Sequence, residues 1–273
     1  MSKTLVVGGN GYIGSHLKKK FSEFIYIGRK DFDLNDKNQI LNFFDKINID
    51  TCIILSAVIS YDKFVDFDSE PFTTNLHGLN NLLSVLDNRT KVIYFSSMTV
   101  YDENSISPVK EDSKLLPLHS YGLSKVYAEQ LVKFYSFKYL IIRIPGIYGG
   151  DRTSGLIYNT IKKMKENKSI EIDTTNLGYW ETMHIDDMID MFSELIINYN
   201  YANKSNTFNI CYGEKTDIIE TINFIKHTLK SNSKIDVNKE YRNFYLSNHN
   251  ILKYVSQPVK YYERLQSYIK ENV

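Results

Sequence analysis

Apolar and polar residues along the first half of the chain form blocks that predict strands followed by helices. Short apolar runs typical of buried strands lie at Leu5–Val7, Phe24–Ile27, Thr51–Leu55, Val92–Phe95 and Tyr139–Ile144. Apolar positions at helical spacing predict helices at Tyr12–Phe21, Gln39–Ile47, Asn75–Leu86 and Tyr121–Phe137. Strands that alternate with helices form a parallel sheet covered on both faces. The pattern therefore predicts an α/β fold with a doubly wound parallel sheet.

The pattern changes after about residue 150. The elements predicted there are a helix at Gly155–Lys165, a strand at Ile170–Ile172, a helix at Met183–Ile197, a strand at Thr207–Ile210 and a helix at Ile218–Leu229. The stretch that follows is polar and aromatic. We therefore expect a main domain over residues 1–150 and a smaller region over residues 151–273 that partly returns to the first.

Composition and charge exclude several classes of function. The chain has 33 Lys and Arg against 32 Asp and Glu, so its net charge of +1 gives no electrostatic case for binding nucleic acid or an anionic membrane. Its two cysteines, Cys52 and Cys211, lie in apolar runs and predict buried thiols, with no disulfide framework and no metal site. The chain enters its first strand at Thr4 without a signal peptide, and no apolar run is long enough to span a bilayer. We therefore expect a cytoplasmic protein.

A glycine-rich turn follows the first strand. Gly8, Gly11 and Gly14 have the spacing G-x-x-G-x-x-G. The first glycine makes the tight turn, the second lets backbone approach a pyrophosphate, and the third lets the helix pack closely on the sheet. Unpaired N–H groups at the start of that helix favour an anion. The turn, including Asn10, Tyr12 and Ile13, predicts the dinucleotide site of a Rossmann-type domain, so residues 1–150 are expected to bind NAD or NADP.

The residues after the second strand bear on which dinucleotide binds. NAD sites usually place an acid there, whereas this strand ends in Gly28, Arg29 and Lys30. Because a guanidinium matches a phosphate bidentately, we favour NADP with Arg29 on the ribose phosphate; the alternative is that Arg29 and Lys30 are solvated turn residues. The remaining predicted contacts of the cofactor are Asp33 and Leu34, near the adenine, and Leu55, Ser56 and Ala57, on its other side.

Tyr121 and Lys125 form a Y-x-x-x-K motif at the start of a predicted helix. Their spacing places both side chains on one face of that helix. A phenol has an unperturbed pKa of about 10, and a neighbouring ammonium lowers it toward the range useful for proton transfer. Ser97 ends the fourth strand and can face the same crevice, where it would hold a substrate oxygen. These three residues are the predicted catalytic group.

Together these motifs resemble the extended short-chain dehydrogenase/reductases of the NAD-dependent epimerase/dehydratase type. The resemblance extends through nearly the whole chain and includes the Arg143–Gly149 segment (R-x-x-x-x-Y-G) and His184–Asp187 (H-x-D-D). It implies an NAD(P)-dependent oxidoreductase acting on a nucleotide-linked sugar. The stretch Gly28–Leu34 is similar in layout to GDP-fucose synthase, which, like many related 4-keto-sugar reductases, uses NADP.

The resemblance also implies roles for individual residues. Lys125 would bind the nicotinamide ribose as well as act on Tyr121, and Pro145 and Ile147 would lie near the nicotinamide. The family usually has an arginine for the substrate diphosphate where this chain has Trp180, so Arg152 and Arg242 are candidate replacements, and Trp180 could stack on the substrate or belong to the core. By analogy with the family, a homodimer could form through the helices predicted at Asn75–Leu86 and Tyr121–Phe137.

Departures from the family pattern narrow the reaction. Dehydratases carry an Asp-Glu pair after the catalytic hydroxyl, and GDP-fucose synthase has a cysteine at the second of these positions. This chain has Met98 and Thr99 instead, neither of which can act as a general acid or base. We therefore predict NADPH-dependent reduction of a keto group on a nucleotide-linked sugar, expected to be a 4-keto-6-deoxyhexose. Two alternatives stay open: a 4-epimerase that retains NAD, and a non-catalytic dinucleotide sensor.

Overall fold

The structure is a computed structural model that describes residues 3–60, 66–136, 138–172, 180–200, 206–237 and 244–272. Two compact units are formed, and the chain passes between them more than once. The first unit contains Met1–Asp102, Lys114–Ile144 and Asn198–Phe208, and the second contains Glu103–Ser113, Pro145–Ile197 and Asn209–Val273.

The first unit is built of strands that alternate with helices. Its elements are β1 (Thr4–Val7), α1 (Tyr12–Lys20), β2 (Ile25–Ile27), α2 (Lys37–Phe44), β3 (Thr51–Ile54), α3 (Glu70–Phe72), the π-helical turn η1 (Thr73–Gly78), α4 (Leu79–Leu83), β4 (Lys91–Ser97), the 3₁₀ turn η2 (Met98–Val100), α5 (Ser120–Tyr135), β5 (Tyr139–Ile144) and β9 (Asn206–Asn209).

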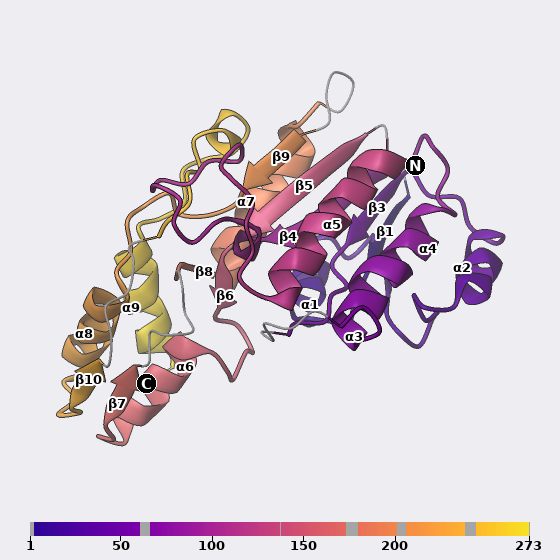
Figure 1. The fold of residues 1–273 in the computed structure, drawn as a ribbon. Coiled ribbons are helices and arrows are strands. Elements are labelled where there is room, and N and C mark those ends of the chain that lie inside the picture. Colours follow the sequence, from indigo (N-terminus) through magenta and orange to yellow (C-terminus); the bar gives the residue numbers. More distant parts are fainter. Residues whose placement is uncertain are drawn as a thin grey trace. The chain divides into compact units, whose positions relative to one another are not determined.

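One sheet of order β2-β1-β3-β4-β5-β9 organises this unit. All neighbouring pairs from β2 to β5 are parallel. Helices α4 and α5 lie side by side and cover the sheet on one face (Figure 1). The predicted doubly wound α/β fold is therefore confirmed. The strand order reverses at β1 and β3, and ligands of such sheets bind in the crevice at the carboxyl ends of the strands where this reversal occurs.

The apolar runs form strands because neighbouring strands bury them against the helices. Leu5, Cys52 and Val92 follow one another across β1, β3 and β4 in register, and none is more than 1% exposed. They share one core with Leu82 of α4 and Val132 of α5. Truncation of such a buried aliphatic side chain to alanine costs about 2–5 kcal/mol. This core fixes the carboxyl ends of the strands, which carry the predicted site residues.

The second unit has two small parallel sheets, in which β6 pairs with β8 and β7 pairs with β10. Its elements are β6 (Gly146–Tyr148), α6 (Leu156–Lys165), β7 (Ile170–Ile172), β8 (Thr182–His184), α7 (Ile185–Asn198), α8 (Ile218–Leu229), β10 (Ile235–Val237), the 3₁₀ turn η3 (Ile251–Lys253) and α9 (Tyr261–Glu271).

One expectation for the second unit was wrong. Met183 and His184, which were assigned to a helix, belong to strand β8 because β6 pairs with that segment. The C-terminal stretch for which no element was predicted forms helix α9, whose buried residues include Leu265 and Ile269 at a spacing of four.

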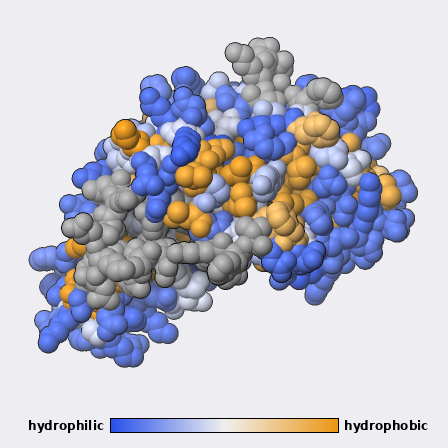
Figure 2. Space-filling model, in the orientation of Figure 1, coloured by the Kyte–Doolittle hydropathy of each residue, from blue (hydrophilic) through white to orange (hydrophobic). Residues whose placement is uncertain are grey.

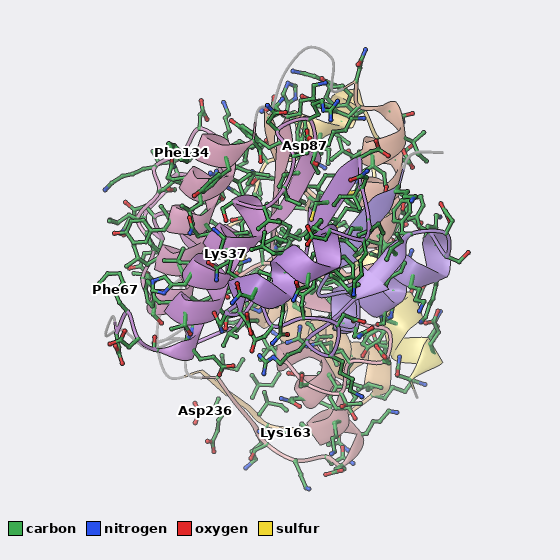
Figure 3. All side chains as sticks on the ribbon, turned by 90° about the vertical axis from the view of Figure 1, so that its right-hand side faces the viewer. Lys37, Phe67, Asp87, Phe134, Lys163 and Asp236 are labelled. Carbon is green, nitrogen blue, oxygen red and sulfur yellow. The ribbon has the colours of Figure 1, made fainter. Side chains whose placement is uncertain are left out.

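Hydrophilic residues cover most of the face shown in Figure 2. Some large apolar side chains are nonetheless exposed, such as Phe134, which is 81% exposed and points outward from α5 (Figure 3). Among the residues that the structure describes, no helix combines the length and the apolar character of a membrane span.

Candidate functional site

The glycine-rich turn adopts the geometry that its spacing predicts. Gly8 has a φ of +83°, in the region that favours glycine, and the N–H groups of Gly8 and Gly9 both donate to Ile27 O, at 3.1 and 2.8 Å. A Cβ on Gly14 would lie 2.5 Å from Gly9 O, so α1 packs directly on the turn. A Cβ on Gly11 would meet only Gly8 O, at 3.2 Å. The backbone at Gly11 is therefore open to a close ligand, as a pyrophosphate requires.

A cavity of about 280 Å³ lies beside this turn, at the carboxyl ends of β1, β2 and β3. Its lining includes six of the predicted cofactor residues, which are Gly8, Arg29, Asp33, Leu34, Ser56 and Ala57. Eight further lining residues are Val7, Ile27, Gly28, Phe32, Asn35, Val58, Glu70 and Thr74. Charged and polar residues such as Arg29 and Asp33 line it together with apolar side chains such as Phe32 and Leu34. A concave site with convergent polar groups is typical of small-molecule binding. The residues present therefore fit the adenosine half of a dinucleotide.

The other predicted cofactor residues of the glycine turn and of β3 do not line this cavity. Asn10 lies next to it, because a Cβ on Gly28 would come within 2.5 Å of Asn10 Nδ2. Leu55 continues β3 by donating its N–H to Val7 O at 2.9 Å. Tyr12 and Ile13 form the first turn of α1. Their contacts with a cofactor stay predictions.

Arg29 is paired with an acid, Glu70, that no sequence motif marks. Its Nη2 lies 3.4 Å from Glu70 Oε1, and the two side chains are 73% and 62% exposed. Both residues line the cavity. Asp33 also lines it and accepts a hydrogen bond at Oδ1 from Asn35 N at 2.9 Å. The edge of the cavity therefore carries charges of both signs.

Ser97 lies at the end of β4 and is 8% exposed. Its hydroxyl oxygen accepts hydrogen bonds from Thr99 N at 3.2 Å and from Thr99 Oγ1 at 2.9 Å. Because both contacts use the oxygen as an acceptor, the proton of Ser97 can be directed toward a ligand. Thr99 thus orients the predicted catalytic hydroxyl.

Tyr121 and Lys125 lie in the first two turns of α5, which packs on the end of β4. The contact is close: a Cβ on Gly122 would clash with Thr99 O. Lys125 Nζ donates to Phe95 O of β4 at 2.7 Å and lies 5.7 Å from the centre of the Tyr121 ring. The structure therefore brings the β4 end that carries Ser97 together with the Tyr–Lys pair.

The environment of Lys125 is apolar and aromatic. Its side chain is 2% exposed, and Nζ lies 4.5 Å from the centre of the Tyr94 ring, close enough for a cation–π contact. Burial lowers the pKa of Lys125 to about 7, although the negative charge of Glu129 acts in the opposite direction. The ammonium form therefore predominates below about pH 7.

A buried ion pair joins Glu129, on the same helix as Tyr121 and Lys125, to Arg143 of β5. Arg143 of β5 donates to both carboxylate oxygens of Glu129, at 2.9 and 2.7 Å, and to Tyr101 Oη at 2.9 Å. Ser96 donates to the same carboxylate at 2.6 Å. The side chains of Arg143 and Glu129 are 3% and 0% exposed. Glu129 was not predicted, although its position four residues after Lys125 places it on the same helix face.

Asn75 is a second residue that sequence reasoning missed. It is 3% exposed within the π-helical turn η1. Its amide exchanges two hydrogen bonds with the backbone of Val58, at 2.8 and 2.9 Å, and donates to Ser124 Oγ at 3.0 Å. Asn75 thus joins the loop after β3, which lines the cofactor cavity at Val58, to the helix that carries the catalytic pair.

The remaining predicted contacts belong to the second unit. Pro145, which directly precedes β6, and Ile147, within β6, are both buried. Arg152 donates through Nη1 to Ile147 O at 2.8 Å, and Trp180 is 8% exposed. Arg242 lies outside the described residues. The roles of these four described residues toward cofactor and substrate stay predictions.

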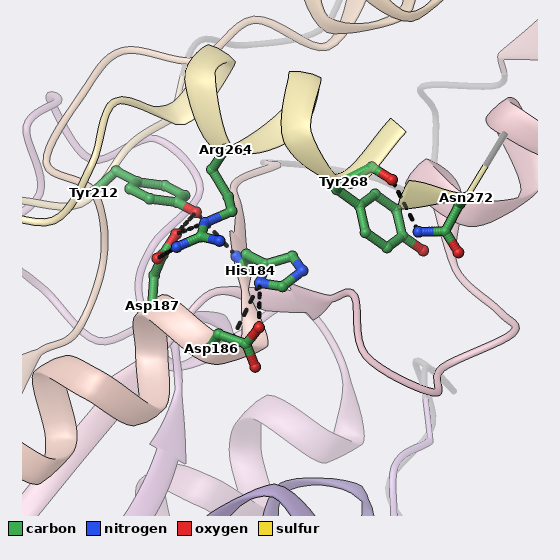
Figure 4. A network of polar contacts seen from close by, with 7 residues as sticks. All are labelled: His184, Asp186, Asp187, Tyr212, Arg264, Tyr268 and Asn272. Carbon is green, nitrogen blue, oxygen red and sulfur yellow. Dashed lines mark hydrogen bonds and ion pairs between the residues drawn. The ribbon is translucent and has the colours of Figure 1, made fainter. Parts of the chain in front are cut away.

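The H-x-D-D segment forms a polar network within the second unit (Figure 4). Arg264 makes two hydrogen bonds to Asp187, at 2.9 and 2.5 Å, and Tyr212 Oη donates to the same carboxylate at 2.6 Å. The N–H of His184 donates to Tyr212 Oη at 3.2 Å, and His184 Nδ1 accepts from Asp186 N at 3.3 Å. His184 is 3% exposed, and its contacts are those of a structural residue.

Glu181 gives a pH-dependent prediction for this unit. It is 1% exposed; Oε2 accepts from Leu246 N at 2.8 Å, and Oε1 has no partner among the described residues. Burial raises the pKa of Glu181 to about 8, so the folded state keeps a proton that the unfolded state releases above about pH 4.5. Wild-type stability relative to Glu181→Gln should fall by about 2 kcal/mol between pH 5.5 and 7. Urea unfolding of both proteins measures this difference, and parallel pH dependences would contradict it.

A model of the NAD dependent epimerase/dehydratase family matches residues 4–211 of the chain. The chain belongs to this family. The resemblance to this family is confirmed, and so is the predicted enzyme class, an NAD(P)-dependent oxidoreductase that acts on nucleotide sugars.

Relatives within the family include reductases and epimerases. The chain is 28% identical over 261 residues to dTDP-4-dehydro-6-deoxyglucose reductase of Escherichia coli, covering 81% of this chain and 80% of the relative. It is 27% identical over 260 residues to a Methanocaldococcus jannaschii protein provisionally named a UDP-glucose 4-epimerase, covering 82% of each chain.

Solved structures show the same fold. That of dTDP-4-dehydrorhamnose reductase from Bacillus anthracis, in complex with NADP, has a TM-score of 0.78 at 20% identity and covers 99% of this chain and 100% of that chain. Other structures of this fold contain NAD. Similarity of fold therefore leaves the choice between NAD and NADP open.

Proposed function

We propose that this member of the epimerase/dehydratase family reduces a keto group on a nucleotide-linked deoxysugar, a 4-keto-6-deoxyhexose, with NADPH. The observation that carries the proposal is the grouping of the β4 end with the Tyr121–Lys125 pair, where Met98 and Thr99 supply no carboxylate. Such a site can move one proton at a carbonyl oxygen, but it lacks the acid and base that water elimination needs. The E. coli reductase relative, which matches over four fifths of both chains, supports this choice.

The proposed mechanism assigns one step to each residue. Bound NADPH would supply the hydride that adds to the carbonyl carbon. Ser97, oriented by Thr99, donates a hydrogen bond to the carbonyl oxygen. Tyr121 transfers its proton to that oxygen as negative charge develops, and the Lys125 ammonium stabilises the phenolate that remains.

Arg29 supports NADPH rather than NADH. It lines the adenosine cavity, and its guanidinium can bind the ribose phosphate through two parallel hydrogen bonds. The nearest acid at the end of β2, Asp31, is engaged in the turn, because its Oδ2 accepts from Gly28 N at 2.8 Å. Asp31 does not line the cavity that contains Arg29.

An epimerase that retains NAD is the second candidate. The relative of M. jannaschii that matches over 82% of the chain carries a provisional epimerase name. The same Ser97, Tyr121 and Lys125 would serve both reactions, because a redox epimerase also moves a hydride and a proton at one carbon. The two candidates differ in whether the cofactor leaves between turnovers.

The pH dependence of the reaction follows from Lys125. Because burial lowers its pKa to about 7, the ammonium is present below that pH and is lost as the pH rises. We expect kcat/KM to fall about tenfold per pH unit above about pH 7. Lys125→Arg should lower kcat/KM but remove this alkaline decline, since arginine stays charged. A wild-type profile that is flat from pH 6 to 9 would contradict the assignment.

A direct assay tests the proposal. Purified protein is mixed with NADPH or NADH and a panel of nucleotide-linked 4-keto-6-deoxyhexoses, and nicotinamide absorbance is followed. The proposal expects rapid loss with NADPH and at least one member of the panel. No loss with any member, together with release of bound NAD on denaturation, would favour the epimerase instead.

A further inference from the structure

An acidic side chain shares the cofactor cavity with the predicted phosphate ligand. Glu70 begins helix α3 and lines the cavity together with Arg29, 41 residues earlier in the chain. The Glu70 carboxylate lies 3.4 Å from the Arg29 guanidinium. Both side chains reach solvent, so a ligand can separate them without unfolding any element.

The two dinucleotides would respond to this pair in opposite ways. The ribose phosphate of NADPH is doubly charged near neutral pH, so it must take Arg29 from Glu70 and then remain near the displaced carboxylate. The ribose of NADH offers a hydroxyl in place of the phosphate, and a carboxylate accepts hydrogen bonds from hydroxyls. Glu70 therefore opposes NADPH and does not oppose NADH.

We propose that Glu70 is a specificity-determining residue of this cofactor site, which competes with the ribose phosphate for Arg29 and narrows the preference for NADPH over NADH. The proposal rests on the proposed function, because it takes Arg29 as the phosphate ligand. Glu70 lies in α3, outside the segment after β2 from which the cofactor preference was predicted. Wild-type protein should accordingly bind both cofactors, with NADPH the tighter.

The expected effect is moderate because the pair is exposed. Exposed ion pairs contribute little, and solvent screens them. Glu70→Gln removes the negative charge. It should lower the Kd for NADPH by about threefold to tenfold and change the Kd for NADH by less than about twofold. Arg29→Gln should raise the Kd for NADPH by about tenfold or more, as expected for loss of a charge-assisted contact with the phosphate.

Isothermal titration with NADPH and NADH measures these constants without knowledge of the sugar substrate. Four proteins are compared with the wild type: Glu70→Gln, Arg29→Gln, the double variant, and Asp68→Asn as a matched control. Asp68 is exposed in the same segment and does not line the cavity. In the Arg29→Gln background, Glu70→Gln should lower the Kd for NADPH by clearly less than it does in the wild type, because the competition for Arg29 is gone and only the direct repulsion between Glu70 and the phosphate remains.

The outcomes separate the two proposals. If Arg29→Gln weakens NADPH but Glu70→Gln leaves both constants unchanged, Glu70 has no role and the NADPH assignment stands. Glu70→Gln could instead lower the Kd for NADPH equally with and without Arg29, or Asp68→Asn could lower it as much. Either result would show that general charge repulsion, and not competition for Arg29, explains the effect. If Arg29→Gln leaves NADPH binding unchanged, the NADPH assignment fails, and the role of Glu70 fails with it.

Discussion

Tyr121→Phe is expected to lower kcat by about 10²–10⁴-fold, because the ring remains but the only proton that it can transfer is lost. The Kd for NADPH should stay within about twofold, because the substitution keeps the aromatic ring and leaves the contact of Gly122 with Thr99, which holds this part of α5, unchanged. Steady-state kinetics with the active sugar nucleotide and titration with NADPH measure the two effects separately.

The same helix offers a matched control. Tyr127 follows on α5 and is 45% exposed, so Tyr127→Phe removes a hydroxyl without touching the Tyr121–Lys125 pair. This variant should retain wild-type kcat. Activity of Tyr121→Phe within about threefold of wild type would remove the tyrosine from the mechanism and leave Ser97 as the candidate proton donor.

Glu129→Gln is expected to destabilise the protein by about 3–5 kcal/mol, because it leaves the guanidinium of Arg143 buried without its counter-charge. The midpoint of urea unfolding, followed by circular dichroism, measures this loss. Glu166→Gln is the control, since Glu166 pairs with Lys168 on the surface, where the change should cost less than about 0.5 kcal/mol.

Removing both charges tests the reason for that loss. If the uncompensated charge is responsible, the double variant Glu129→Leu with Arg143→Met should be more stable than Glu129→Gln alone. A double variant less stable than the single one would show that the hydrogen bonds to Ser96 and Tyr101 contribute more than the charge balance does.

Local patterns predicted the fold of the first unit well, because its strands and helices are continuous runs. The register of β1, β3 and β4 joins the apolar runs that the sequence identified. Two of the three residues of β8, Met183 and His184, were predicted to be helical, because this short segment forms a strand only through its pairing with β6. Helix α9 is different, because its buried residues already have helical spacing in the sequence. They are Tyr261, Leu265, Tyr268 and Ile269.

The candidate site likewise has residues that local sequence predicts and residues that only tertiary packing brings together. The Tyr121–Lys125 pair was predictable because four residues separate two positions on one helix face. The pairing of Arg29 with Glu70 was not, because it joins a strand end to a distant helix and depends on tertiary packing. Asn75, whose side chain spans the loop after β3 and the start of α5, was missed for the same reason.

Isotope labelling shows whether the enzyme moves a hydride from NADPH to the sugar. The protein is incubated with NADPH deuterated at the transferable position and the nucleotide-linked 4-keto-6-deoxyhexose that it accepts, and the sugar product is examined by mass spectrometry and NMR. The account predicts one deuterium on the former carbonyl carbon and one NADP formed for each sugar reduced. A sugar product without deuterium, formed while NADPH is not consumed, would contradict it.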